Sequence, residues 1–113
     1  MVTTHTRKGC MAFEELTSRH AVMWGSAPFE NIAHLITDMH VGLVERLAPV
    51  AGEHWLDLGC GVGDVAFHAA RAGATVTGSD LSPTLIETAR RRAEEYGLDL
   101  TLEVGDAQHL SYA

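Results

Sequence analysis

The sequence predicts an α/β fold in which two helices precede a parallel sheet of three strands. Between residues 54 and 104 the chain alternates between short strand-like segments and helical segments that glycines close. Strands separated by helices of this length form right-handed crossovers, which make a parallel sheet. A run of glycines directly follows the first predicted strand, at the end of the sheet where ligands of doubly wound folds bind.

The first fifty residues are predicted to be helical. Residues 1–10 are polar and are expected to lack regular structure. Residues 11–22 predict a short helix, and Trp24–Pro28 interrupts the pattern. Apolar residues then recur at steps of three and four, which predicts a second helix with one buried stripe formed by Phe29, Ile32, Ile36, Met39, Leu43 and Leu47. Pro49 and Gly52 end it.

Capping residues bound the predicted elements after residue 50. A strand covers 54–58, and Asp64 stands at the N-cap of a helix that Gly73 ends. A second strand covers 74–79. The next helix has Ser82 as its N-cap, Pro83 at its first position and Gly97 as its stop. Residues 98–104 alternate between apolar and polar side chains, which predicts a third strand.

Length, composition and charge exclude several classes of protein. The chain has 113 residues, which fits one domain, and no apolar run approaches the ~18 residues of a membrane span. Its net charge of −7 argues against a surface that tracks nucleic-acid phosphates. Lys8, the single lysine, is followed by Gly9 and Cys10, so there is no Walker A loop. We therefore expect neither a nucleic-acid nor a membrane partner.

The cysteines and the N-terminus predict a cytoplasmic protein. Cys10 and Cys60 do not make a disulfide framework, and there is no Cys-x-x-Cys motif. The N-terminus has no apolar stretch after Arg7 and Lys8, so it is not a secretory signal. The histidines show no metal-binding spacing, and no metal site is expected.

Three groups follow the three predicted strands and should meet in one crevice. They are the Gly59–Gly63 loop, Asp80 and Asp106. The glycines permit positive φ and a close backbone approach, and the next helix offers unpaired N–H groups. A carboxylate at the end of the second strand can accept hydrogen bonds from both hydroxyls of a ribose. This arrangement predicts a ligand of the adenosine type.

The spacing of the glycines favours one kind of adenosine ligand over another. A dinucleotide loop has the pattern G-x-G-x-x-G, whereas this loop is G-x-G-x-G with Asp64 next. The carboxylates of Asp57 and Asp64 would repel a pyrophosphate. They suit a ligand that carries an ammonium or sulfonium group.

Three segments resemble motifs of the class I S-adenosylmethionine-dependent methyltransferases. Residues 55–63, Trp-Leu-Asp-Leu-Gly-Cys-Gly-Val-Gly, resemble the first motif, residues 77–83 the second-strand motif, and residues 105–110 the segment after the third strand. The resemblance implies a Rossmann-like three-layer sandwich with a partial parallel sheet in strand order 3-2-1. It also implies S-adenosylmethionine as cofactor, S-adenosylhomocysteine as product, and a methyl acceptor, for which a small molecule is the default.

The resemblance implies roles for individual residues in cofactor binding. Asp57 would lie near the amino group of the cofactor, and Asp80 would hold the ribose hydroxyls. Leu81 would pack on the adenine, and Asp106 would accept a hydrogen bond from the exocyclic amine of that ring. The full set of expected cofactor-binding residues is Asp57, Gly59, Cys60, Gly61, Gly63, Asp80, Leu81, Asp106 and Ala107.

The resemblance also predicts how the chain is organised. One partial methyltransferase domain spans 1–113, with a helical cap over 1–50 and the cofactor-binding half over 51–113. The family sheet has further strands after the third, so the chain is expected to be a fragment, or to complete itself as a homodimer or strand-exchanged oligomer. Arg19, His20 and Trp24 are candidates for a lid, and Arg90–Arg92 is read as a solvated face with i,i+4 partners.

The favoured hypothesis is a methyltransferase, with no catalytic residue assigned and His20 as the candidate for a general base. Two alternatives stay open. The first is a non-catalytic module that binds S-adenosylmethionine or a nucleoside. The second is a nicotinamide-dependent oxidoreductase, which the glycine spacing and Asp57 disfavour.

Overall fold

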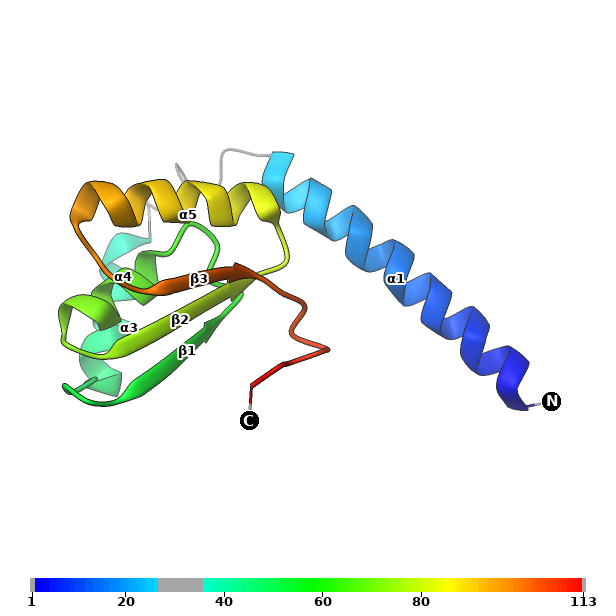
Figure 1. Ribbon diagram of the computed structural model, residues 1–113, viewed down its shortest axis with the longest axis horizontal. Helices are drawn as coiled ribbons and strands as arrows, with labels where there is room; N and C mark the ends of the chain where they lie inside the picture. Colours follow the sequence, from blue (N-terminus) through cyan, green and yellow to red (C-terminus); the bar gives the residue numbers. More distant parts are fainter. Residues whose placement is uncertain (1, 27–35, 113) are drawn as a thin grey trace.

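The computed structural model describes residues 2–26 and 36–112. Figure 1 shows a long N-terminal helix that extends away from the sheet and from the other helices. The elements, in chain order, are α1 (Val2–Ser26), α3 (Thr37–Leu47), β1 (His54–Leu58), α4 (Asp64–Arg71), β2 (Thr75–Asp80), α5 (Pro83–Tyr96) and β3 (Thr101–Val104). The three strands are parallel in the order β1-β2-β3. This confirms the predicted α/β fold and its strand order.

Helices α4 and α5 pack on one face of the sheet. Trp55 and Val76 pack with Ala66 and Ala69 of α4. Beside them, Leu102 of β3 packs with α5 residues Ile86 and Ala89, and with Phe67 of α4. On the opposite face Leu56 is 41 % exposed, and Leu58 is similarly exposed. The described residues therefore form two layers, and the third layer of the predicted sandwich is not among them.

The ends of the helices follow their capping chemistry, with one correction. The Ser82 hydroxyl accepts a hydrogen bond from the Leu85 N–H at 3.3 Å, and Gly97 ends α5 with φ +64°, as predicted. The N-cap of α4 is Gly63, so the prediction that Asp64 is the cap was wrong. Asp64 is the first helical residue, and its carboxylate bonds to Arg92 instead.

Strand β3 is shorter than the predicted 98–104. The Leu98 N–H donates to the Ala93 carbonyl at 2.9 Å, which extends the C-terminal turn of α5. The strand therefore begins only at Thr101.

The N-terminal half departs most from the sequence prediction. Residues 2–10 belong to α1 rather than lacking structure, and this helix continues through Trp24 to Ser26. In α3 the stripe predicted to be buried is exposed: Met39 is 63 % exposed, and Leu43 and Leu47 are also exposed. The helix buries Val44 instead, because that face packs on α4. Phe29 and Ile32, the first residues of the stripe, lie outside the described residues.

A glycine fixes where α1 meets the rest of the molecule. The end of α1 contacts α5, and a Cβ added at Gly25 would lie 2.8 Å from the Ser82 hydroxyl and 2.9 Å from the Thr84 Cβ. Only a glycine allows this approach without a shift of the backbone. The contact places the C-terminal half of α1 beyond the carboxyl ends of the strands.

Candidate functional site

A cavity of about 670 Å³ lies between the carboxyl ends of the strands and α1. Six of the nine predicted site residues line it: Gly59, Gly61, Asp80, Leu81, Asp106 and Ala107. The topology therefore brings the three predicted groups together, because parallel strands end at the same edge of a sheet. Asp57, Cys60 and Gly63 are not among the lining residues.

The glycine loop is held to the neighbouring strand and leaves its backbone open to the cavity. The N–H groups of Gly59 and Cys60 both donate to the Ser79 carbonyl, at 2.7 and 3.0 Å. Gly59 and Gly61 have φ of +70° and +55°, in the left-handed region that favours glycine. A Cβ at either residue would meet no protein atom within 4 Å. The space beside both glycines is therefore available to a ligand.

Asp80 is oriented by two backbone hydrogen bonds. Its Oδ2 accepts from the Gly61 N–H and its Oδ1 from the Ser82 N–H, each at 2.9 Å. A carboxylate has about four lone-pair positions, so each oxygen can accept one further bond. Asp80 thus ties the loop to β2 and still offers two acceptors to a ligand, as a pair of ribose hydroxyls would require.

Asp106 completes the edge of the cavity after β3. The Gly105 N–H donates to the Asp80 carbonyl at 2.9 Å, which joins the ends of β2 and β3. The Asp106 Oδ1 accepts from the Gln108 N–H at 2.9 Å, and its Oδ2 lies 3.6 Å from Nδ1 of His109. These contacts order the turn that carries Asp106 and Ala107.

Asp57 lies on the helix-covered face of the sheet, behind the glycine loop. Burial raises the pKa of its carboxyl group, and the hydrogen bond from the Ala66 N–H opposes that shift. The charge of Asp80 raises this pKa further, and His40 lowers it. Among the described residues, the Asp57 Oδ2 has no hydrogen-bond partner. The carboxylate therefore supports the start of α4 from behind the loop.

Cys60 and Gly63 also support the loop from behind. Burial, followed by the charges of Asp57 and Asp80, raises the pKa of the Cys60 thiol to about 12. This thiol packs in the core beside Phe67 and Ile86, so it is protonated and unreactive at neutral pH. Gly63 has φ +95°, and a Cβ there would lie 2.5 Å from the Phe67 ring.

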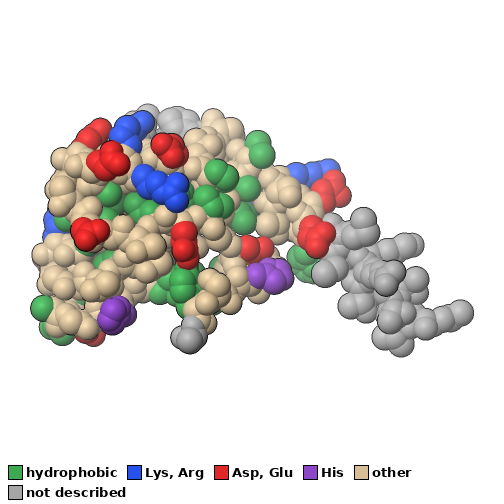
Figure 2. Space-filling model, in the orientation of Figure 1, with side chains coloured by type: hydrophobic (Ala, Val, Ile, Leu, Met, Phe, Trp, Pro, Cys, Tyr) green, Lys and Arg blue, Asp and Glu red, His purple; other side chains and the backbone are tan. Residues whose placement is uncertain are grey.

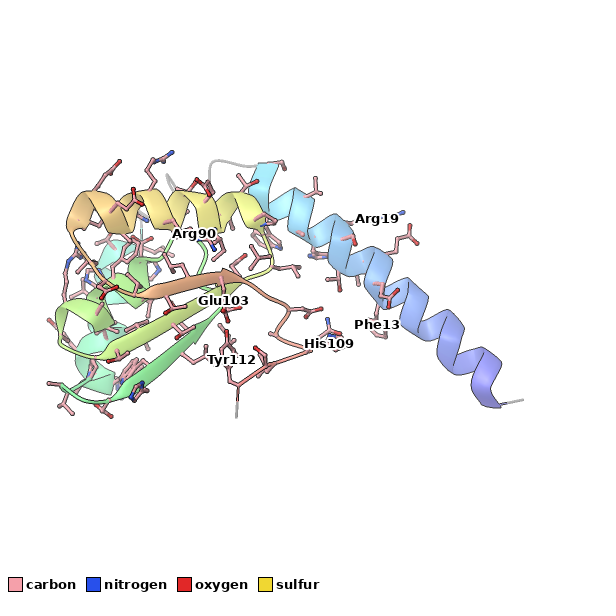
Figure 3. All side chains as sticks on the ribbon, viewed as in Figure 1. Phe13, Arg19, Arg90, Glu103, His109 and Tyr112 are labelled. Carbon is pink, nitrogen blue, oxygen red and sulfur yellow. The ribbon has the colours of Figure 1, made fainter. Side chains whose placement is uncertain are left out.

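One face of α1 forms the opposite wall of the cavity. It contributes Phe13, Leu16, Thr17, His20 and Trp24, which share one face because positions 13, 16/17, 20 and 24 follow one another at about one helical turn. Two of the three lid candidates, His20 and Trp24, line the cavity. The third, Arg19, pairs with Glu15 at 2.6 Å on an exposed face and points away from the sheet in Figure 3. The helical spacing of Phe13, Leu16 and Thr17 was the signal that could have added them.

The remaining lining residues were not predicted as site residues. Leu58 is the last residue of β1, and Ser79 is the next-to-last residue of β2. Leu85 lies in the first turn of α5, and Gly105 and Gln108 flank Asp106 and Ala107. In Figure 3 the labelled Phe13 projects from α1 and the labelled His109 from the tail after β3, the two segments that border the cavity away from the sheet.

Arg92 is not part of a solvated face, so the interpretation of 90–92 was wrong at this residue. Its side chain is only 13 % exposed and forms a 2.9 Å ion pair with Asp64. Burial lowers the pKa of this guanidinium, but hydrogen bonds with Asp64 and Tyr96 outweigh that effect and the pKa is raised. Arg90 also bonds within the fold, to the Leu102 carbonyl at 2.9 Å. Arg91 is exposed, with Glu95 at 3.9 Å, as the predicted i,i+4 pairing expects.

Within residues 2–26 and 36–112 no cluster of metal-ligating side chains occurs. None of the helices in these two ranges has the length and hydropathy of a membrane span. On the face drawn in Figure 2, Lys and Arg side chains are interspersed with Asp and Glu and form no single basic patch.

Comparison with known proteins decides the family. The family model described as "Methyltransferase domain" matches residues 56–113, just over half of the chain. The chain belongs to this methyltransferase family. It is 34 % identical over 88 residues to a ubiquinone biosynthesis O-methyltransferase of Coxiella burnetii, an alignment that covers 78 % of this chain and 38 % of that protein. The chain thus spans about two fifths of the length of this relative.

Solved methyltransferases share the fold. A tRNA (uracil-54, C5)-methyltransferase of Pyrococcus abyssi, in complex with S-adenosyl-L-homocysteine, is 35 % identical with a TM-score of 0.57, over 65 % of this chain and 19 % of that one. The magnesium protoporphyrin IX methyltransferase of Synechocystis PCC 6803, with the same product bound, matches with a TM-score of 0.69 at 24 % identity, over 84 % of this chain and 53 % of that one. S-adenosylmethionine is the cofactor of this family.

Proposed function

We propose that this chain is the cofactor-binding half of an S-adenosylmethionine-dependent methyltransferase and that the cofactor binds in the 670 Å³ cavity. The observation that carries the proposal is the geometry of Asp80. Its two oxygens are fixed by the Gly61 and Ser82 N–H groups and keep lone pairs for a pair of hydroxyls. An adenosine ribose presents such a pair.

Different lining residues contact different parts of the cofactor. Gly59 and Gly61 face the amino-acid part, because their backbone has no side chain between it and the cavity. Asp80 binds the ribose. Leu81 packs on the adenine, and Asp106 with the Ala107 N–H binds the edge of that ring. Asp57, Cys60 and Gly63 act from behind the loop by holding its shape.

The methyl acceptor is a small molecule with an apolar body. When bound, S-adenosylmethionine supplies a methyl group on a sulfonium, which is already activated toward in-line displacement. The chain then has to position the acceptor and exclude water, and the α1 wall supplies apolar and aromatic surface for both tasks. In this proposal residues 1–50 cap residues 51–113. The O-methyltransferase activity in the name of the Coxiella relative supports an oxygen acceptor.

Calorimetric titration with S-adenosylmethionine and S-adenosylhomocysteine tests the proposal. We expect saturable binding to the wild-type chain and loss of at least about tenfold in affinity in Asp80→Asn, since one charge-assisted acceptor is removed. Asp99→Asn changes an exposed carboxylate outside the cavity and serves as the matched control. A folded wild-type chain that binds neither ligand would overturn the proposal. Binding without any methyl transfer to a panel of phenols would favour the non-catalytic alternative.

A further inference from the structure

Arg92 joins α5 to the end of the glycine loop. Its Nη1 donates to the Val62 carbonyl at 2.8 Å, and its Nη2 donates to the Asp64 Oδ1 at 2.9 Å. These two acceptors flank Gly63, the N-cap of α4. The guanidinium therefore spans the residue at which the loop becomes a helix.

The position of the guanidinium is fixed by aromatic rings. Its central carbon lies 5.3 Å from the centroid of the Phe67 ring and 5.7 Å from that of Tyr96, and these two rings meet edge to face. Arginine packs well on such rings and presents two parallel donors, whereas lysine presents a single ammonium group. The two acceptors and the two rings therefore fit a guanidinium better than an ammonium group.

The Val62–Gly63 peptide is restrained on both sides. Its carbonyl accepts from Arg92, and its N–H donates to the Cys60 carbonyl at 2.9 Å. Gly61, the residue before Val62, lines the cavity and donates its own N–H to Asp80. The loop is thus held at Gly61 from β2 and at residues 62–64 from α5. The ion pair also neutralises Asp64, whose carboxylate is directed to α5.

We propose that Arg92 is a positioning residue that shapes the glycine loop for the amino-acid part of the cofactor. The inference rests on the proposed function, because it assigns that part of the ligand to Gly59 and Gly61. Arg92 does not line the cavity, so it acts through the loop backbone. On the adenosine side, Asp80 accepts from the N–H groups of Gly61 and Ser82, and Asp106 accepts from the Gln108 N–H, so neither carboxylate bonds to Arg92.

Two ligands separate this role from a general structural one. S-adenosylhomocysteine carries the amino-acid part, and 5′-methylthioadenosine lacks it. In Arg92→Met we expect the dissociation constant of S-adenosylhomocysteine to rise about tenfold, with that of 5′-methylthioadenosine changing by less than about twofold. In Arg92→Lys we expect a smaller rise of about threefold, since one of the two hydrogen bonds is retained.

A control at Arg91 and two further variants separate the loss of the Arg92 contacts from a general loss of structure. Arg91→Met removes a neighbouring exposed arginine and should change neither affinity. If Arg92→Met does not fold, Arg92→Lys and Asp64→Asn carry the same comparison, because both keep much of the packing. Equal weakening of both ligands, or no weakening of either, would overturn the positioning role. A wild-type chain that binds neither ligand would instead be the failure of the proposed function.

Discussion

Among single residues, Asp57 is a carboxyl group for which burial favours the neutral form. Its pKa is raised above the ordinary value of 3.8, chiefly by burial. The folded state therefore holds the Asp57 proton to higher pH than the unfolded state does. As the pH rises from 3.8 through the raised pKa, the free energy of unfolding falls by the cost of ionising this buried group.

In Asp57→Asn the free energy of ionising the buried group is absent, because an amide does not ionise. The amide oxygen can still accept the hydrogen bond from the Ala66 N–H. Relative to wild type, we expect the variant to gain stability as the pH rises through that window and to keep the gain at neutral pH. Urea unfolding of the ligand-free protein at several pH values measures the difference. Asp99→Asn, at an exposed position, provides the comparison. A wild-type-minus-variant difference that does not change with pH would contradict the assignment.

At the scale of elements, the turn from the glycine loop into α4 depends on Gly63. The backbone of Gly63 lies in the left-handed region, where a residue with a Cβ is strained by about 1–2 kcal/mol. A Cβ there must also displace the Phe67 ring, which costs about 1–3 kcal/mol more. Gly97 also has positive φ, but the space around it is open. We therefore expect Gly63→Ala to lower the free energy of unfolding by more than Gly97→Ala, as measured by urea titration. Equal losses in the two variants would show that Phe67 moves aside freely.

The elements also show which parts of the fold were predictable. From β1 to β3 the signals are local: Ser82, Pro83 and Gly97 bound α5 by their own backbone chemistry, and those bounds were correct. In α3 the apolar stripe was visible, but which face becomes buried depends on what α4 offers, and α4 packs on Val44. The three strand-end groups converged as predicted because parallel topology requires it. Arg92 was misread because its partners lie 28 and 30 residues away along the chain.

At the scale of the whole molecule, the described sheet has an open edge and an open face. β1 pairs only with β2, and Leu56 on the face away from α4 is 41 % exposed. An unpaired edge beside exposed apolar side chains is a template for another strand, and natural edges suppress such pairing with lysine. We expect the isolated chain to associate with a second copy through β1. Sedimentation velocity at low and high protein concentration should show a concentration-dependent dimer.

Leu56→Lys places a charge on this open face and should shift the protein to the monomer. The variant should keep its cofactor affinity, because Leu56 does not line the cavity. Val50→Lys is the matched control: Val50 is also exposed, but it precedes β1, so the dimer should persist. Association that survives Leu56→Lys would mean that the contact uses another surface, such as the exposed stripe of α3 around Met39. A chain that is monomeric at every concentration would mean that the β1 edge does not pair between copies, despite its exposed apolar neighbours.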